Sequence, residues 1–198
     1  QSVEGYIHKK FKETYHANVD HFLPGILSLS GNEGFRAAVG LRKAESEPLF
    51  LEQYLDKTIE NEVSAQFGAC VRRDQVIEIG NLVSTYRGSS QLLFLFLTEF
   101  LDRVHRRFVV FTATKEVLKT LHKLNLAFLT LCEARPEKLQ GCSEQWGKYY
   151  SARPQVMAGD VSACAAVIRK NGMALEVVRG IEADLAKIIL EWSEYDAK

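Results

Sequence analysis

One apolar run in the middle of the chain, residues 76–85, constrains the fold more than any other segment. Its aliphatic side chains favour a strand buried on both faces, but Glu78 and Asn81 interrupt the run with groups that are unfavourable to bury without partners. A short loop over 86–91 with an arginine and a glycine follows, and then an apolar helix is predicted over about 90–106. A strand, a basic turn and a helix N-terminus in this order can hold an anionic group on backbone N–H donors.

The balance of charge excludes one class of partner. The chain has 198 residues, with 25 basic and 25 acidic side chains. This balance gives no electrostatic surface for nucleic acid, so no nucleic-acid partner is predicted. The apolar run 92–97 is much shorter than the roughly 20 residues of a membrane-spanning helix, so no transmembrane segment is predicted either.

The cysteines indicate a reduced compartment and no metal. Four cysteines are far apart and form neither a C-x-x-C pair nor a zinc-ligand spacing with the five histidines. A cytoplasmic protein without a metal site is therefore expected. Because the chain begins with Gln1 rather than Met, an upstream piece is conceivable and secretion stays open.

The remaining pattern alternates strands with helices, which predicts a partly parallel sheet with ligand chemistry at the C-terminal ends of its strands. A turn over 31–34 joins two strands into an antiparallel hairpin. The predicted strands are 26–30, 35–41, 76–85, 108–114 and 128–131. The predicted helices are 7–15, 58–67, 90–106, 115–124, 161–170 and 175–192, with Thr58 and Asp160 as N-caps.

Polar and aromatic side chains outside the central strand are candidates for a site. Glu52 is interpreted either as a site residue or as a solvated helix carboxylate. Thr112 and Thr114 end a buried strand at the edge where a ligand is expected. The aromatic cluster 146–150 suits either a pocket wall or a core plug, and the sequence leaves both open.

Several familiar catalytic motifs are missing from the sequence. It contains no G-x-S-x-G elbow, no P-loop and no H-E-x-x-H, which disfavours a serine hydrolase, an NTPase and a zincin. Gly88 stands alone, so the dinucleotide fingerprint is also excluded.

The central strand and its loop resemble the GNAT acyltransferase superfamily. Residues 78–83 are similar to its Glu-x-x-Asn-Leu-Ala-Val strand, and 87–92 to its Arg-Gly-x-Gly-x-Gly/Ala loop. In that superfamily the loop binds the pyrophosphate of coenzyme A. The loop here is about two residues shorter, and Ser90 and Leu92 replace small residues that let backbone approach phosphate.

The superfamily's tyrosine acid also lacks a direct counterpart. Leu121 stands in its place, which passes the role to His122, Tyr149 or Tyr150, or to no side chain.

A closer resemblance is to the thermostable hemolysin family. Four blocks carry it in order: 49–55, 78–82, 111–114 and 146–150. The resemblance implies a GNAT-like α/β fold, shared with the acyl-homoserine-lactone synthases, over 1–160: a mixed, partly parallel sheet flanked by helices. A C-terminal helical extension over 161–198 would pack on this domain or on a partner chain, and a homodimer stays open.

The fold so implied points to acyl transfer from a coenzyme A thioester, or from the phosphopantetheine arm of an acyl carrier protein, to a small amine. Any hemolysis would then be secondary to an amphiphilic product. A direct lysin would need a spanning helix or a strongly lytic segment, neither of which is evident. A direct membrane-active protein and a catalytically inactive GNAT-like binding protein are the alternatives.

The resemblance also implies residue roles. Glu78 would be the base, Asn81 would orient the acceptor or the base, and Tyr149 is a candidate acid. The alternative for Glu78 is a hydrogen-bonded strand carboxylate tied to a neighbouring arginine. The backbone N–H of Val83 would polarise the thioester carbonyl. The donor phosphate would be held by Arg87, Gly88, Ser89 and Ser90. The substrates would contact Glu52, Tyr54, Phe111, Thr112, Thr114, Trp146 and Tyr150.

Overall fold

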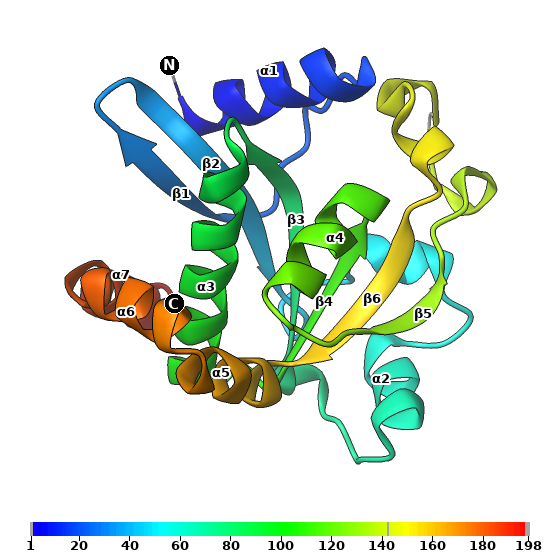
Figure 1. The fold of residues 1–198 in the computed structure, drawn as a ribbon. Helices are drawn as coiled ribbons and strands as arrows, with labels where there is room; N and C mark the ends of the chain where they lie inside the picture. The colour runs from blue at the N-terminus through cyan, green and yellow to red at the C-terminus, as the bar shows by residue number, and fades with distance from the viewer. Residues whose placement is uncertain (1, 142, 197–198) are drawn as a thin grey trace.

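A mixed β-sheet forms the centre of the protein, in a computed structural model that describes residues 2–141 and 143–196 (Figure 1). Within these residues the sheet has six strands in the order β1-β2-β3-β4-β6-β5. The strands are β1 (Gly25–Gly31), β2 (Gly34–Lys43), β3 (Val76–Ser84), β4 (Phe108–Ala113), β5 (Leu129–Glu133) and β6 (Gln155–Asp160). The β3–β4 pair is parallel and the other pairs are antiparallel, which confirms the predicted hairpin and the partly parallel sheet.

Helices cover both faces of the sheet (Figure 1). One face carries α3 (Arg87–Arg103), α4 (Lys115–Lys123), α5 (Val161–Lys170), α6 (Gly172–Gly180) and α7 (Glu182–Asp196). The other face carries α1 (Val3–Tyr15), α2 (Ile59–Phe67) and the 3-10 helix η1 (Phe50–Tyr54). The remaining 3-10 turns are η2 (Arg73–Gln75), η3 (Pro136–Lys138), η4 (Ser143–Trp146) and η5 (Tyr149–Ala152).

The parallel strands β3 and β4 separate halfway along β3. They pair from Val76 and Phe108 as far as Ile79 and Phe111. Beyond Ile79, no described strand pairs with β3 on the side of β4. The pairing of β3 with β2 also shifts register here, at Asn81, whose φ of 51° is left-handed. A bulge of this kind bends its strand, so β3 leaves β4 and a gap opens in the sheet.

The prediction of a loop over 86–91 is wrong, because most of this segment is helical. Tyr86 is extended and α3 begins directly at Arg87, with the Ser89 N–H bonded to the Tyr86 carbonyl. Gly88 has open space around it, so a helical turn forms there without obstruction. The predicted helix therefore exists but lies about three residues earlier in the chain.

The sequence pattern missed β6, which is inserted between β4 and β5. Its small residues gave no clear strand signal in the sequence. One of them, Gly159, is required by packing, because a Cβ there would lie 2.4 Å from the Phe128 ring. Asp160 caps α5 as predicted, since its carboxylate accepts a bond from the Ala163 N–H. The single helix predicted over 175–192 is instead two helices that meet at Ile181.

Helices α5, α6 and α7 pack on α3 and share its apolar core. Ile168, Val178, Leu185 and Trp192 belong to the same cluster as Phe100 of α3. No helix in the described ranges is both long and apolar enough to cross a membrane.

Candidate active site

A pocket of about 400 Å³ lies where β3 and β4 separate. This volume falls in the range of small-molecule sites. Its walls come from the C-terminal halves of both strands, from α1, and from two connecting segments, 18–23 and 139–150. The pocket therefore lies at the strand ends, the place where the alternation of strands and helices predicts ligand chemistry.

The pocket extends through the gap in the sheet. On the side of η1 its wall contains Glu78, Arg42 and Tyr54. On the side of α3 and α4 it contains Phe94 and Val117, with Ile79 and Phe111 at the gap itself. Since neighbouring side chains of a strand point to opposite faces, the ionisable end and the apolar end are separated by the plane of the sheet.

Glu78 is the buried ionisable group of this pocket. It is 3% exposed, and its carboxylate accepts bonds from the backbone N–H groups of Phe50 (3.0 Å) and Leu51 (2.9 Å) at the start of η1. Burial raises its pKa to about 7, although the two N–H groups and the nearby Arg42 oppose that shift. A carboxyl group with such a pKa can accept a proton at neutral pH.

Arg42 is the cationic neighbour of Glu78. The two residues are cross-strand partners on β2 and β3, and Arg42 Nη1 lies 3.9 Å from Glu78 Oε2. Arg42 Nε also faces the Glu47 carboxylate at 3.0 Å. Sequence reasoning missed Arg42, because only the register of the hairpin brings it opposite Glu78.

Aromatic side chains form the wall opposite the sheet, and the same side chains pack against the core, so the cluster has both of the features that the sequence left open. Trp146, Tyr149 and Tyr150 all line the pocket, beside Phe11 and Tyr15 of α1. Trp146 and Tyr149 contact each other with ring centroids 5.5 Å apart. The pattern of α1 gave no sign that two of its apolar residues reach a ligand site.

The tyrosine hydroxyls of the pocket are held in their protonated form. Burial raises the pKa of Tyr149 far above its ordinary value and that of Tyr150 to about 12. The Tyr150 hydroxyl is hydrogen-bonded to that of Tyr54, whose pKa is also raised by burial. Each of these groups is therefore uncharged near neutral pH and keeps an O–H that can donate a hydrogen bond.

Phe111, Thr112 and Thr114 also line the pocket, as predicted. In α4, Leu121, which replaces the superfamily's tyrosine, is buried in the core, and the acid candidate His122 is exposed and outside the pocket wall. The acid candidates that line the pocket are Tyr149 and Tyr150, beside the alternative that no side chain has this role.

Asn81 lines the pocket, but its amide already has two partners. Its Oδ1 accepts a bond from the Leu23 N–H (2.9 Å), and its Nδ2 donates to the His21 carbonyl (3.3 Å). Gly40 leaves room for this contact, because a Cβ there would lie 2.8 Å from Leu23 Cβ and 2.9 Å from Asn81 Oδ1. We therefore assign Asn81 to holding the segment 18–23 as a wall of the pocket, rather than to orienting a substrate.

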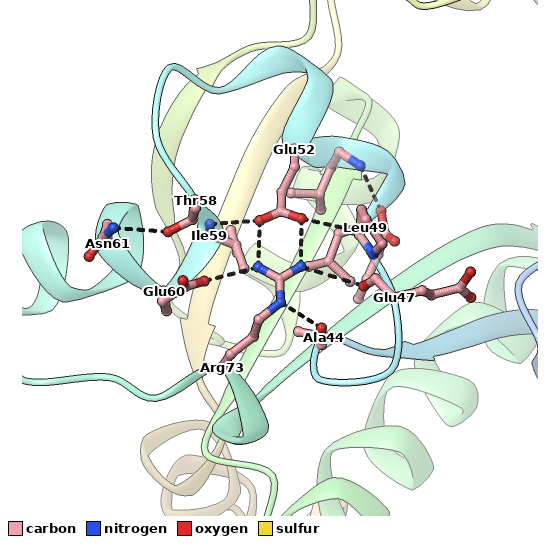
Figure 2. Close-up of polar contacts among 12 residues, drawn as sticks. Ala44, Glu47, Leu49, Glu52, Thr58, Ile59, Glu60, Asn61 and Arg73 are labelled. Carbon is pink, nitrogen blue, oxygen red and sulfur yellow. Dashed lines mark hydrogen bonds and ion pairs between the residues drawn. The ribbon is translucent and has the colours of Figure 1, made fainter.

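Glu52 lies outside the pocket wall, which corrects the prediction that it contacts substrate. Both of its oxygens accept bonds from Arg73 at 2.7 Å, and they also accept the backbone N–H groups of Leu49 and Ile59 (Figure 2). Burial raises the pKa of Glu52, but these donors outweigh it and hold the pKa at about 2. Arg73 further contacts Glu60 and the Ala44 carbonyl, so the cluster fastens η1 to α2 and the end of β2.

The predicted phosphate-binding residues form the first turn of α3. Gly88, Ser89 and Ser90 do not line the pocket, and the Ser90 hydroxyl is bonded to that of Ser84. The side chain of Arg87 lies outside the described part of the structure. Val83 points its side chain into the core beneath α1, so only its backbone could contact a ligand.

The fold matches those of solved acyltransferases. BjaI, a coenzyme A-dependent acyl-homoserine lactone synthase solved with SAM and isopentyl-CoA, is similar with a TM-score of 0.55 and 13% identity, over 83% of this chain and 77% of BjaI. FeeM, an N-acyl amino acid synthase from uncultured soil microbes, has a TM-score of 0.55 and 13% identity, over 82% of this chain and 91% of FeeM. The AHL synthase LasI has a TM-score of 0.47 and 8% identity over 69% of this chain, which spans 64% of LasI. The likeness to BjaI and FeeM shows that the protein has a GNAT-like fold.

A family model described as thermostable hemolysin matches residues 1–165. The chain therefore belongs to the thermostable hemolysin family, as its four sequence blocks predicted. No curated protein matches the chain.

Proposed function

We propose that this protein transfers an acyl group from a coenzyme A or acyl-carrier-protein thioester to a small amine, with Glu78 as the general base. One observation carries the proposal: a carboxyl group 3% exposed, with a pKa of about 7, in a pocket of about 400 Å³ between separated strands. The likeness to BjaI and FeeM, whose descriptions name acyl-homoserine lactone and N-acyl amino acid synthesis, supports the same reaction class.

In the reaction, Glu78 takes one proton from the ammonium form of the acceptor, which frees the nitrogen lone pair. The nitrogen attacks the thioester carbonyl carbon, a C–N bond forms and the C–S bond breaks. As the C–S bond breaks, the thiolate takes up a proton from Tyr149 or Tyr150, and the nitrogen's second proton passes through water to the resulting phenolate. Glu78 then releases its proton to solvent. Both phenols are protonated near neutral pH, so either is available as this acid.

The two ends of the pocket suit the two substrates. The acyl chain would lie among apolar groups such as Phe94, Phe111 and Val117, and the amine would lie beside Glu78. The stretch of β3 beyond Ile79 has no described strand partner on the side of β4, so N–H groups such as that of Val83 are candidates to polarise the carbonyl. The N-terminal turn of α3, including Gly88 and Ser89, would hold a phosphate of the donor.

In this account hemolysis comes from the product. Joining a fatty acyl chain to a small polar amine makes an amphiphile, which can disperse a membrane as a detergent does. We place the reaction in the cytoplasm, where acyl thioesters of both kinds are available.

Mass spectrometry of lipid extracts tests the proposal. Cells expressing the chain should contain a new acylated amine that is missing from cells expressing Glu78→Gln and retained with Glu137→Gln, an exposed carboxylate outside the pocket. The extract with the new compound should lyse red cells. Identical lipid profiles, together with lysis by purified protein alone, would replace the enzyme with a direct lysin.

A further inference from the structure

We propose that the acceptor is an α-amino acid, whose carboxylate binds Arg42 while its amine faces Glu78. This inference rests on the proposed acyl transfer and adds the chemical class of the acceptor. The evidence for it is the arrangement of charged side chains in the pocket wall.

The wall presents a cation and a carboxyl group side by side. Arg42 and Glu78 point to the same side of the sheet, and Arg42 Nη1 lies 3.9 Å from Glu78 Oε2. An α-amino acid carries its ammonium and carboxylate on one carbon, so its two charges are separated by a similar distance. A zwitterion of this size can contact both groups at once, with opposite charges facing each other.

Arg42 has donors left for such a ligand. Its Nε faces Glu47, and its Nη1 donates to the Pro48 carbonyl at a long 3.4 Å. The structure shows no hydrogen bond from Nη2 to any described residue, and the side chain is only 18% exposed. The edge formed by the two terminal nitrogens matches a carboxylate, which accepts two parallel bonds from a guanidinium.

Glu78 likewise keeps acceptor capacity. Each of its oxygens accepts one backbone N–H, and a carboxylate has about four lone-pair sites. A protonated amine can therefore bind without displacing η1.

Arg42 is the one strongly basic side chain that the described pocket wall offers to a carboxylate. Among the described residues, Arg42 is the only Arg or Lys side chain in the wall, and the other charged groups there are Asp20 and Glu78. His21 also contributes to the wall, but it is largely exposed and lies beside Asp20, at 3.7 Å. A carboxylate placed away from Arg42 could contact neutral donors such as Asn18, Thr112 and Gln145, but it would find no second Arg or Lys among the described wall residues. An amine without a carboxylate, in contrast, would leave Nη2 of Arg42 without a partner.

The test compares acceptors that differ only in the carboxylate. Purified protein is given a panel of butanoyl- to palmitoyl-coenzyme A thioesters, with phenylalanine or phenethylamine and with leucine or isoamylamine as acceptors. Thiol release and product mass are measured. The wild-type protein should acylate each amino acid with a kcat/KM at least about 30-fold above that of its decarboxylated partner, the lower end of the effect of a buried charge pair.

Variants of Arg42 then identify the group responsible. Arg42→Gln should lower kcat/KM for the amino acids by at least about 30-fold more than for the decarboxylated amines, whose own rate changes only through the loss of the nearby charge that lowers the pKa of Glu78. Arg42→Lys should keep part of the preference that Arg42→Gln loses, because lysine retains the positive charge but not the planar guanidinium that binds a carboxylate through two bonds. Arg36→Gln, which removes an exposed arginine of β2 outside the pocket wall, should match the wild type. Activity on the decarboxylated amines shows that each variant is folded.

The outcomes separate the two proposals. Equal acylation of amines with and without a carboxylate by the wild type would overturn the amino-acid acceptor and leave acyl transfer standing. A preference for amino acids that Arg42→Gln does not reduce would overturn the role of Arg42. No acylation of any acceptor with any donor would overturn the proposed function and this inference with it.

Discussion

Glu78 has the ionisation behaviour expected of a base that works near neutral pH. Its pKa rises from an ordinary 4.5 to about 7 because burial removes water from the carboxylate, while two backbone N–H groups keep it in place. The charged form is therefore well oriented but held in an unfavourable environment, which makes it a stronger proton acceptor than an exposed glutamate.

This burial predicts a pH dependence of both stability and activity. Because the folded-state pKa is the higher one, the folded protein binds more protons between about pH 4.5 and about pH 7. The free energy of unfolding should fall by about 3 kcal/mol as pH rises through this window. Over the same window kcat/KM should rise, with a midpoint near pH 7.

Urea unfolding of wild type and Glu78→Gln at about pH 5 and about pH 8 checks this prediction. The variant should lack the Glu78 contribution, so that its stability differs less between the two pH values. A wild type and a variant with the same pH dependence would show that Glu78 titrates normally.

The residues that could be predicted from sequence are those whose role lies within one strand or one short motif. Glu78 stands out because a carboxyl group interrupts an apolar strand. The cluster around Trp146 stands out because three large aromatic residues fall within five positions. Arg42 could not be predicted, since its significance depends on the register of β2 against β3. The partners of Asn81 and Glu52 also come from distant or non-adjacent backbone, which no local pattern reveals.

At the scale of elements, the bulge in β3 links the opening of the sheet to the placement of the segment 18–23. The left-handed Asn81 bends β3 away from β4, and the same residue's amide binds the backbone of Leu23 and His21. Gly40 on the neighbouring strand provides the space in which these groups meet. One local deviation therefore both opens the pocket and closes one of its walls.

Asn81→Gly should release this wall without disturbing the bulge. Glycine adopts the left-handed conformation readily, so the main loss is the pair of hydrogen bonds. The free energy that opposes local opening of the segment 18–23 should fall by about 1 kcal/mol. Amide hydrogen exchange at Leu23 should then be roughly fivefold to tenfold faster.

The matched control for Asn81→Gly is Asn125→Gly, which changes another left-handed asparagine, at the end of α4 and outside the pocket wall. It should leave the exchange of the Leu23 amide unchanged. Equal exchange in both variants would mean that the amide of Asn81 does not hold the segment.

The cluster around Glu52 and Arg73 fastens η1, whose N–H groups hold Glu78. Arg73→Leu leaves a partly buried carboxylate without its main partner and should lower the free energy of unfolding by about 2–3 kcal/mol, between the values for exposed and buried pairs. Arg72→Leu is the control, because the neighbouring Arg72 is exposed and contacts Asp74. Its effect should stay below about 0.5 kcal/mol.

The pH dependence of this cluster has the opposite sign to that of Glu78. The folded-state pKa of Glu52, about 2, is below the ordinary 4.5. Its contribution to the free energy of unfolding is therefore present above about pH 4.5 and is lost as pH falls toward about 2. Urea unfolding of both arginine variants at about pH 7 and about pH 3 checks the pair. The difference between wild type and Arg73→Leu should shrink in acid, and a constant difference would contradict this assignment.

Elements differ in how far sequence predicts them, for physical reasons. The hairpin β1–β2 and the helices α1 and α2 have local signals in their turn residues and apolar spacing. Strand β6 is stabilised by its two neighbours rather than by its own composition, and the start of α3 depends on the backbone of Tyr86. The break between α6 and α7 likewise follows from packing against α3, which both helices contact.

At the scale of the whole molecule, the three C-terminal helices pack on α3 and share its apolar core. Trp192 contacts Phe100 of α3 with ring centroids 5.4 Å apart, and Arg169 of α5 pairs with the buried Glu99 at 2.8 Å. A chain that ends at residue 160 would expose this face of α3. We expect such a chain to lose cooperative urea unfolding, measured by circular dichroism, whereas independent folding of 1–160 would support a domain boundary there.

The most direct test of the central claim is an assay of amine-dependent thiol release by purified protein with acyl-coenzyme A, with the product identified by mass. We expect an amide product from the wild type. Glu78→Gln should form this product at a rate at least about 100-fold lower, the usual scale for loss of a general base. Donor binding without turnover, or equal rates for wild type and Glu78→Gln, would contradict the central claim.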